Sequence, residues 1–355
     1  MKSNKNGFDI KEYYLPPEWD KHEATWLGWP HNLLDWPSKF TPIPWVYAEI
    51  ARYISRDETV RIVVENEDHK KKALRVLKSV DLNIENIEFF ILPTNRGWMR
   101  DSGPAFLKKK KTSLTAAVNF RFNGWAKYDN YKKDEKLPAF IAKKFGMEKI
   151  VPVHNNRHVV LEGGSIDTNG SGTLITTEEC LMDENQQVRN PGFTKKDYET
   201  LFKNYLGIEQ TIWLGKGITG DDTHGHVDDL CRFVSKDTVV LVREKNQNDP
   251  NYLHLEENRE RLDGVKLPDG TPLKVIDLPM PAPLIFRGER LPASYANFYI
   301  SNYAVLVPTF NDPNDKIALG ILSDLISDRP VVGVHAVDLV WGLGTIHCLT
   351  HEQPA

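Results

Sequence analysis

The chain has 355 residues, of which 40% are hydrophobic and 26% charged, so it can bury a substantial core. Its 45 lysines and arginines against 49 aspartates and glutamates give a formal net charge of −4, which excludes the basic excess of a nucleic-acid-binding protein. A mean hydropathy of −0.45 excludes a membrane protein.

The first 20 residues, MKSNKNGFDIKEYYLPPEWD, begin with basic residues but contain no apolar run long enough for a secretory signal. We therefore expect a cytoplasmic protein. No Gly/Ser linker, long charge block or low-complexity tract interrupts the sequence, which predicts one continuous domain over residues 1–355.

Short runs rich in Val, Ile, Thr and Phe recur along the chain with turn residues between them, and each such pair of runs predicts a β-hairpin. Apolar residues at three- and four-residue spacing predict helices at 67–80 and 313–326. The predicted hairpins cover residues 105–122, 165–180, 230–244 and 297–310. The repeating order of hairpin, helix and strand indicates an α/β fold.

A polar residue stands at the entry to each predicted hairpin. Asp101, Glu162, His226 and Asn297 occupy these positions, and Cys348 follows near the end of the chain. If the repeats surround an axis, equivalent strand ends meet there, and these five side chains are expected to share one cavity.

The chain has three cysteines, Cys180, Cys231 and Cys348, which are far apart in the sequence and form no CxxC pair. Each is expected to be a free thiol. Cys348 is either a buried core thiol or a nucleophile, and a nucleophile needs a base nearby or a lowered pKa. His347 is a poor base, because in an extended segment it would face away from the side of Cys348. A histidine distant in sequence is the better candidate.

The stretch GDDTHGHVDDL supplies such histidines, since His224, His226 and Asp228 lie on one face if the segment is extended. Three interpretations compete: a metal site, one acid/base histidine with a carboxylate, and a surface histidine pair. Glu162, followed by two glycines, is expected to accept the second ring N–H of His226.

Three further acids in these motifs, Asp101, Asp222 and Asp228, place too much negative charge in one cavity unless the ligand is a cation. A planar guanidinium fits, because two carboxylates can each bind its nitrogens and leave the central carbon facing a nucleophile. Trp98 is expected to form an aromatic wall for cation–π contact.

Six motifs in order now resemble the agmatine deiminase / bacterial-type peptidylarginine deiminase family of guanidine-modifying enzymes, over nearly the whole chain. They are LPPEWDKHEATWLGWP, WMRDSGP, LEGGSID, DDTHGHVDDLCRFV, YANFYISN and GTIHCLTHEQP. The resemblance implies a five-bladed α/β-propeller, or pentein, of ββαβ repeats around a pseudo-fivefold axis. The chain departs from the family at GLGT, residues 342–345, where a run of glycines is usual, and at Tyr303, where the family more often has the glycine of an Asn-Gly.

The resemblance also implies roles for individual residues. It makes Cys348 the nucleophile, His226 the general acid/base, Glu162 its partner, and Asp101 with Asp228 the guanidinium clamp. Asp222 matches a position that lies in the active site of the agmatine enzymes. No metal or organic cofactor is implied.

The expected function is therefore hydrolysis of agmatine to N-carbamoylputrescine and ammonia through a covalent S-alkylthiouronium on the cysteine. The alternatives are a peptidylarginine deiminase, a deiminase of another guanidine, a metal hydrolase, and a non-enzymatic polyamine or guanidine binder. A small cationic guanidine is the expected partner, with no nucleic acid and no membrane, and a homodimer is the expected assembly if the chain self-associates.

Overall fold

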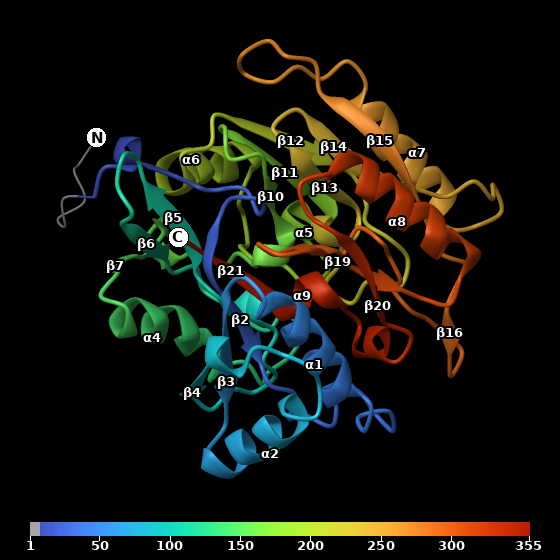
Figure 1. Ribbon diagram of the computed structural model, residues 1–355. Helices are drawn as coiled ribbons and strands as arrows, with labels where there is room; N and C mark the ends of the chain where they lie inside the picture. The colour runs from blue at the N-terminus through green and yellow to red at the C-terminus, as the bar shows by residue number, and fades with distance from the viewer. Residues whose placement is uncertain (1–7) are drawn as a thin grey trace.

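The computed structural model describes residues 8–355 (Figure 1). The first seven residues, part of the segment in which the sequence predicts no secretory signal, lie outside the described residues. No helix between residues 8 and 355 is both long and apolar enough to cross a bilayer.

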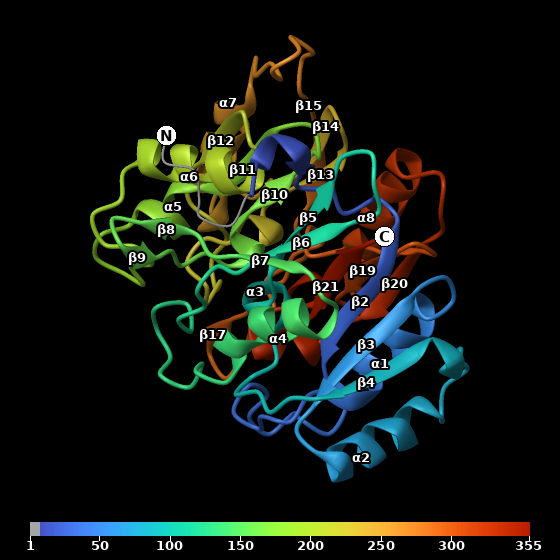
Figure 2. The same ribbon diagram turned by 90° about the vertical axis from the view of Figure 1, so that its left-hand side faces the viewer.

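Over the described residues the chain forms five sheets of three or four strands and two short hairpins. The first sheet has the order β21 (Thr350–Pro354), β2 (His22–Gly28), β3 (Thr59–Val64) and β4 (Ile87–Ile91). The second has the order β1 (Tyr13–Tyr14), β5 (Ala105–Lys109), β6 (Thr115–Val118) and β7 (Glu148–Ile150). Because β21 pairs with β2, the last strand joins the sheet built by the start of the chain (Figure 2).

The three remaining large sheets have three strands each. They are β10 (Asp167–Thr168), β11 (Thr173–Thr177) and β12 (Gln210–Leu214); β13 (Cys231–Ser235), β14 (Thr238–Arg243) and β15 (Lys274–Pro279); and β18 (Tyr299–Ile300), β19 (Val305–Thr309) and β20 (Val331–His335). The two hairpins pair β8 (Val153–His154) with β9 (Arg157–His158), and β16 (Ile285–Phe286) with β17 (Glu289–Arg290).

All five sheets share one connectivity. In four of them an antiparallel pair of consecutive strands comes first, and its second strand then pairs with a parallel strand that follows a helical crossover. In the fifth, β2 pairs with β3 in the same parallel way, and β21 from the end of the chain takes the place of the first strand. Central strands such as β14 and β19 are buried along nearly their whole length, as expected for strands covered on both faces. The fold is therefore mixed α/β, as the sequence predicts.

The longer helices lie towards the outside of the molecule in Figure 1. They are α1 (Ile43–Ile54), α2 (Glu67–Leu77), α4 (Leu137–Lys144), α6 (Lys195–Leu206), α7 (Asn251–Leu262) and α8 (Pro313–Leu325), and the shorter α5 (Glu178–Met182) precedes α6. Local sequence fixes their ends: Thr194 and Asp197 form a capping box at the start of α6, and Gly207 ends it with a φ of 73°.

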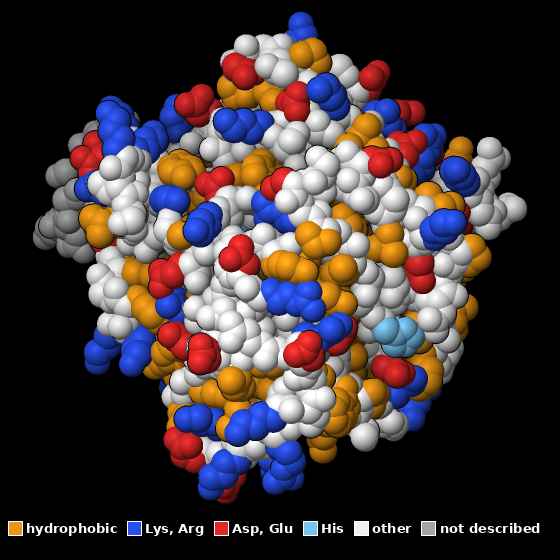
Figure 3. Space-filling model, in the orientation of Figure 1, with side chains coloured by type: hydrophobic (Ala, Val, Ile, Leu, Met, Phe, Trp, Pro, Cys, Tyr) orange, Lys and Arg blue, Asp and Glu red, His pale blue; other side chains and the backbone are white. Residues whose placement is uncertain are grey.

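The predicted hairpins and helices are confirmed. The four hairpins correspond to β5/β6, β10/β11, β13/β14 and β18/β19, and the two helices to α2 and α8. On the face shown in Figure 3, basic and acidic side chains are interspersed and form no single basic patch.

Near the middle of the molecule the chain forms several single helical turns instead of regular elements (Figure 1). They are the short helices α3 (Met99–Ser102) and α9 (Ile346–Leu349) and the 3₁₀ turns at Gly163–Ser165 and Val227–Asp229. The turn at Gly163–Ser165 packs against both α3 and the turn at Val227–Asp229, and α3 packs against α9. These turns bring together the polar residues that precede the hairpins.

Candidate active site

Cys348 lies at the end of a cavity of about 450 Å³, which we call the Cys348 cavity. Its lining includes Asp35, Arg96, Trp98, Asp101, Asp222 and Cys348. The thiol is 5% exposed, and Gly344 is the reason it can face the cavity: a Cβ on Gly344 would lie 2.9 Å from the Trp98 ring and 3.2 Å from Cys348 Sγ. Larger residues at position 344 would therefore displace one wall of the cavity.

The Cys348 thiol has two polar neighbours. Asn297 Nδ2 donates to Sγ at 3.1 Å, and Asp228 Oδ2 lies 3.6 Å from Sγ. Burial raises the pKa of the thiol well above its ordinary value, and the carboxylates of Asp228, Asp229 and Asp101 raise it further. In the absence of a cation, Cys348 is therefore a thiol and not a thiolate at neutral pH.

Asp101 is held by neutral donors. Its Oδ1 accepts the backbone N–H of Gly164 at 2.9 Å, and its Oδ2 accepts Trp125 Nε1–H at 2.8 Å. Gly164 fills a position where no side chain fits, because a Cβ there would lie 2.6 Å from His226 Nδ1 and 3.0 Å from Asp228 Oδ2. The second glycine of LEGGS thus lets Asp101, His226 and Asp228 approach one another.

His226 lies 3.8 Å from Asp101 Oδ1 and 3.9 Å from Asp228 Oδ1, measured from its Nδ1. Neither ring nitrogen has a hydrogen-bond partner among the described residues. Burial lowers the pKa of His226, but the charge of Asp101, with smaller contributions from Cys180 and then Asp228, outweighs it and raises this pKa well above the ordinary value. This direction favours the imidazolium form of the resting histidine.

Glu162 is fully buried beside this histidine, but the predicted hydrogen bond between them is not formed in this structure. Its Oε1 accepts Arg189 Nε–H at 3.1 Å, and its Oε2 has no partner among the described residues. Arg189 compensates the buried carboxylate and draws it away from the ring. A carboxylate oxygen of Glu162, the sulfur of Cys180 and a ring nitrogen of His226 nevertheless lie within 4.8 Å of one another.

The motif around His226 is not extended. His224 and His226 would share one face only in an extended segment, so that prediction does not apply here. His224 and Gly225 have φ angles of 66° and 91°, and His224 Nε2 contacts Asp183 Oδ2 at 2.8 Å. Asp221 holds this turn by accepting the backbone N–H groups of Gly225 and His226 at 2.7 and 2.9 Å. His224 therefore points away from the cavity.

His347 also differs from the extended geometry assumed for it, since it belongs to the helical turn α9. It lines a different cavity from Cys348, as expected, but its Nδ1 contacts Asp228 Oδ2 at 2.7 Å. The two neighbouring residues therefore share one carboxylate oxygen.

Between residues 8 and 355, two sets of three side chains have ligand atoms close enough to share a cation. They are Glu162, Cys180 and His226, and Asp228, Asp229 and Cys348, and the atoms of each set lie within 4.8 Å of one another. His224 belongs to neither set, so the HxHxD arrangement does not form.

Asp222 and Trp98 form outer walls of the Cys348 cavity. Asp222 accepts Lys127 Nζ–H at 2.5 Å and Tyr128 O–H at 2.7 Å, and Trp98 stacks on Trp36 with ring centroids 5.4 Å apart. Asp222 is thus already paired with a lysine. Of the two departures from the family, Leu343 lines the cavity with a φ of 68°, whereas Tyr303 accepts a hydrogen bond from Arg56 elsewhere.

Sequence reasoning missed several residues that hold this site. Trp125 binds Asp101, Arg189 binds Glu162, and Asp221 orders the backbone of the histidine turn. Asp221 could have been found, because it lies within the motif DDTHGHVDD. Trp125 and Arg189 belong to no recognisable motif, and only the fold brings them to the site.

The chain is similar over nearly its whole length to proteins of known family and structure. The model of the Porphyromonas-type peptidyl-arginine deiminase family matches residues 14–354. The agmatine deiminase of Ectopseudomonas mendocina is 32% identical over 97% of this chain and 96% of its own. The solved agmatine deiminase of Enterococcus faecalis superposes with a TM-score of 0.88 at 29% identity, covering 97% of this chain and 96% of its own. A C. jejuni agmatine deiminase with substrate bound gives a TM-score of 0.84 at 30% identity, with the same coverage.

Proposed function

Because the chain belongs to the Porphyromonas-type peptidyl-arginine deiminase family, we propose that it is an agmatine deiminase, which hydrolyses agmatine to N-carbamoylputrescine and ammonia. One observation of the site carries this proposal. Asp101 and Asp228 are both buried next to Cys348, and neither contacts an arginine or lysine among the described residues. His226 is the one cationic neighbour of these two buried carboxylates within the described chain, so the pair keeps an excess of negative charge that favours a cationic ligand.

In this proposal the substrate guanidinium lies between Asp101 and Asp228, with its central carbon facing Cys348 Sγ. The cation offsets the two carboxylates that raise the pKa of the thiol, so binding favours the thiolate. Asn297 Nδ2–H, 3.1 Å from Sγ, also favours the charged form. The substrate therefore activates its own nucleophile.

The thiolate of Cys348 attacks the guanidinium carbon and gives a neutral tetrahedral adduct. The imidazolium of His226 donates a proton to one nitrogen, the C–N bond breaks, and ammonia leaves a cationic S-alkylthiouronium. Neutral His226 then takes a proton from water, and the water oxygen attacks the same carbon. The C–S bond breaks, which returns the thiolate and releases the ureido product. The second water proton goes to solvent, where ammonia takes it up.

Glu162, Asp222 and Trp98 have supporting roles in the proposal. Glu162 Oε2 has no partner among the described residues and is available to a ring N–H of His226 when substrate is bound. Asp222 lies in the wall of the Cys348 cavity, where its negative charge favours a cationic substrate tail. Trp98 offers a ring face for cation–π contact, worth about 0.5–2 kcal/mol.

The connectivity of the five sheets supports a finer proposal for the fold. Five ββαβ units arranged around a pseudo-fivefold axis would form one domain over residues 1–355, with the single turns that hold the site near that axis. Closure through β21 and β2 is the contact that such a ring requires.

The function is tested by ammonia release from agmatine, free arginine and a peptide with a blocked arginine, with and without a chelator. Turnover of agmatine alone, unaffected by the chelator, is expected. Turnover of the peptide instead would assign the protein as a peptidylarginine deiminase. A thermal shift with agmatine but no ammonia would assign it as a binder, and loss of activity with the chelator would favour a metal hydrolase.

A further inference from the structure

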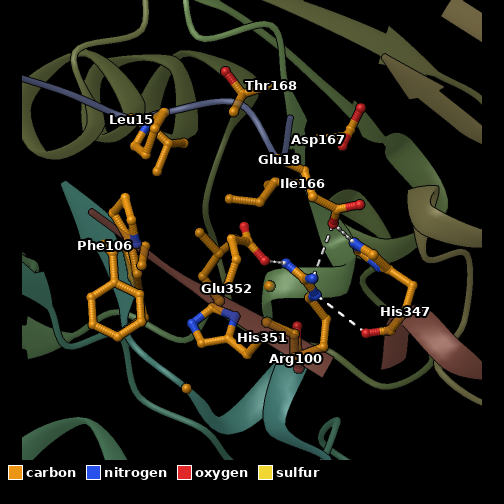
Figure 4. A pocket seen from close by; sticks show the side chains of 18 residues that line it. Leu15, Glu18, Arg100, Phe106, Ile166, Asp167, Thr168, His347, His351 and Glu352 are labelled. Carbon is orange, nitrogen blue, oxygen red and sulfur yellow. Dashed lines mark hydrogen bonds and ion pairs between the residues drawn. The ribbon is translucent and has the colours of Figure 1, made fainter. Parts of the chain in front are cut away.

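Behind the helical turn α9 lies a second, smaller cavity of about 70 Å³, which we call the His347 cavity (Figure 4). Its charged and titratable lining includes Glu18, Arg100, Asp167, His347, His351 and Glu352. Glu18 comes from LPPEWD, a motif that the proposed chemistry leaves without a role. In Figure 4 the Glu18 carboxylate points to the His347 ring and to the Arg100 guanidinium.

Glu18 is the centre of a buried network. Its Oε1 accepts the backbone N–H of Ile300 at 2.8 Å and pairs with Arg232 at 2.9 Å. Its Oε2 lies 3.1 Å from Arg100 NH2 and 2.8 Å from His347 Nε2. These contacts from separate parts of the chain fix the carboxylate, and through Nε2 they fix the plane of the His347 ring.

The other side of the same ring holds Asp228. His347 Nδ1 lies 2.7 Å from Asp228 Oδ2, while Asp228 Oδ1 is buried and has no partner between residues 8 and 355. Each ring nitrogen of His347 therefore contacts a carboxylate oxygen, Nδ1 that of Asp228 and Nε2 that of Glu18. This arrangement occupies one oxygen of Asp228 and leaves the other free beside His226.

We propose that His347, anchored by Glu18, is a positioning residue that orients Asp228 so that its free oxygen receives the substrate guanidinium. The inference rests on the proposed guanidinium clamp. It gives the N-terminal motif a function at the active site, because the LPPEWD carboxylate is connected to the clamp through a single imidazole ring.

Two substitutions of His347 separate its two contacts. In His347→Asn the side-chain amide nitrogen takes the place of Nδ1 and can still donate to Asp228. In His347→Gln the amide nitrogen takes the place of Nε2 and contacts Glu18 only. If His347 acts through Asp228, the asparagine variant keeps Asp228 oriented for the guanidinium and the glutamine variant does not.

The readout is the selectivity of Cys348 between two alkylating agents, one with a cationic amidine (2-chloroacetamidine) and one neutral (iodoacetamide). Each forms a C–S bond and expels halide, but only the amidine needs Asp228 in place. We expect the ratio of the amidine rate to the neutral rate to fall about 10- to 100-fold in His347→Gln and to change by no more than about threefold in His347→Asn. Rates measured on Cys348→Ala give the background from the other cysteines.

His351→Gln is the matched control. His351 is a second buried histidine of the same cavity, whose Nε2 contacts the Pro104 carbonyl oxygen at 2.7 Å and not Asp228. Its replacement is expected to leave the ratio unchanged. An equal fall in all three variants, or no fall in His347→Gln, would overturn the inference.

If His347→Gln does not fold, Glu18→Gln tests the same connection, and a smaller fall in the ratio is expected; an unchanged ratio would overturn the inference. The alkylation ratio does not depend on turnover. Failure of wild-type protein to release ammonia from agmatine would therefore refute the proposed function while leaving this inference to be judged on its own data.

Discussion

The two cavities on either side of α9 contain the same types of residue but pair them differently. Every acid of the His347 cavity contacts an arginine: Glu18 and Glu352 contact Arg100, Asp167 contacts Arg232, and Glu162 contacts Arg189. At the Cys348 cavity, Asp35 and Asp222 also contact a cationic side chain, but Asp101 accepts hydrogen bonds from neutral donors only, and the nearby Asp228 has one free oxygen within the described chain. The acids of both sets are buried or half-buried, so pairing more than burial distinguishes the acids that stabilise the fold from those that are available to a cationic ligand.

The comparison is tested most strongly by neutralising one acid on each side. Asp228→Asn should lower kcat/KM for agmatine about 10³-fold, with a small loss of stability, because it removes half of the clamp. Asp167→Asn should lower the free energy of unfolding by about 3 kcal/mol, because Arg232 loses one of its two carboxylates. Steady-state kinetics give kcat/KM for both variants, and urea denaturation gives their free energies of unfolding. Equal losses of kcat/KM and of stability in the two variants would refute the distinction.

A smaller loss of activity is expected when a side chain is added at Gly164, next to His226 and the two carboxylates. Gly164→Ala places a Cβ 2.6 Å from His226 Nδ1, so kcat should fall about 100-fold as the imidazole and the two carboxylates move apart. Gly320→Ala is the matched control, because nothing lies within 4 Å of a Cβ in that helix, and it should stabilise the protein by about 0.5–1 kcal/mol. Unimpaired turnover in Gly164→Ala would show that the close approach of these groups is dispensable.

The protonation of the free thiol gives a third test. Because unpaired carboxylates raise the pKa of Cys348, iodoacetamide should react slowly at neutral pH and faster as the pH rises towards that pKa. Asp101→Asn should lower this pKa and so speed alkylation of Cys348 about tenfold at neutral pH. The rate is measured across a pH series, and a profile identical to wild type would contradict the proposed influence of Asp101.

The smallest predicted effect on activity comes from Asp35, in the wall of the Cys348 cavity. Burial raises the pKa of Asp35 to about 7, although Arg96 lies 2.7 Å away, and its Oδ2 has no partner within residues 8–355. As the pH rises through this value the carboxyl ionises, so KM for agmatine should fall about threefold. Asp35→Asn should remove the dependence, as should butylguanidine, whose tail is uncharged. If KM for agmatine still depends on pH in Asp35→Asn, another titrating group causes the dependence.

The sequence alone predicted the elements whose signals are local. Alternating apolar runs with turn residues gave the hairpins at 105–122 and 297–310, and three- to four-residue spacing gave α2 and α8. The single turns α3 and α9 were not predicted, because four-residue helices have no periodicity and depend on their tertiary contacts.

The candidate site was predicted to a similar extent. Motif positions identified Cys348, His226 and Asp101, which the structure brings to one place. The left-handed backbone at His224 and the ion pair of Glu162 with Arg189 were not visible in the motifs, because both arise from the packed structure. The pairing of each acid, on which the comparison of the two cavities depends, can be read only from the fold.

The most direct test of the central claim is a search for a covalent adduct on the Cys348 peptide after wild-type protein is quenched during turnover of agmatine. Mass spectrometry should find agmatine minus ammonia attached to this peptide, and Cys231→Ala, a core thiol in β13, should give the same adduct and full ammonia release. Cys348→Ala should give neither, with turnover lowered at least about 10⁴-fold. Ammonia release that persists in Cys348→Ala, or an adduct on another residue, would contradict the account.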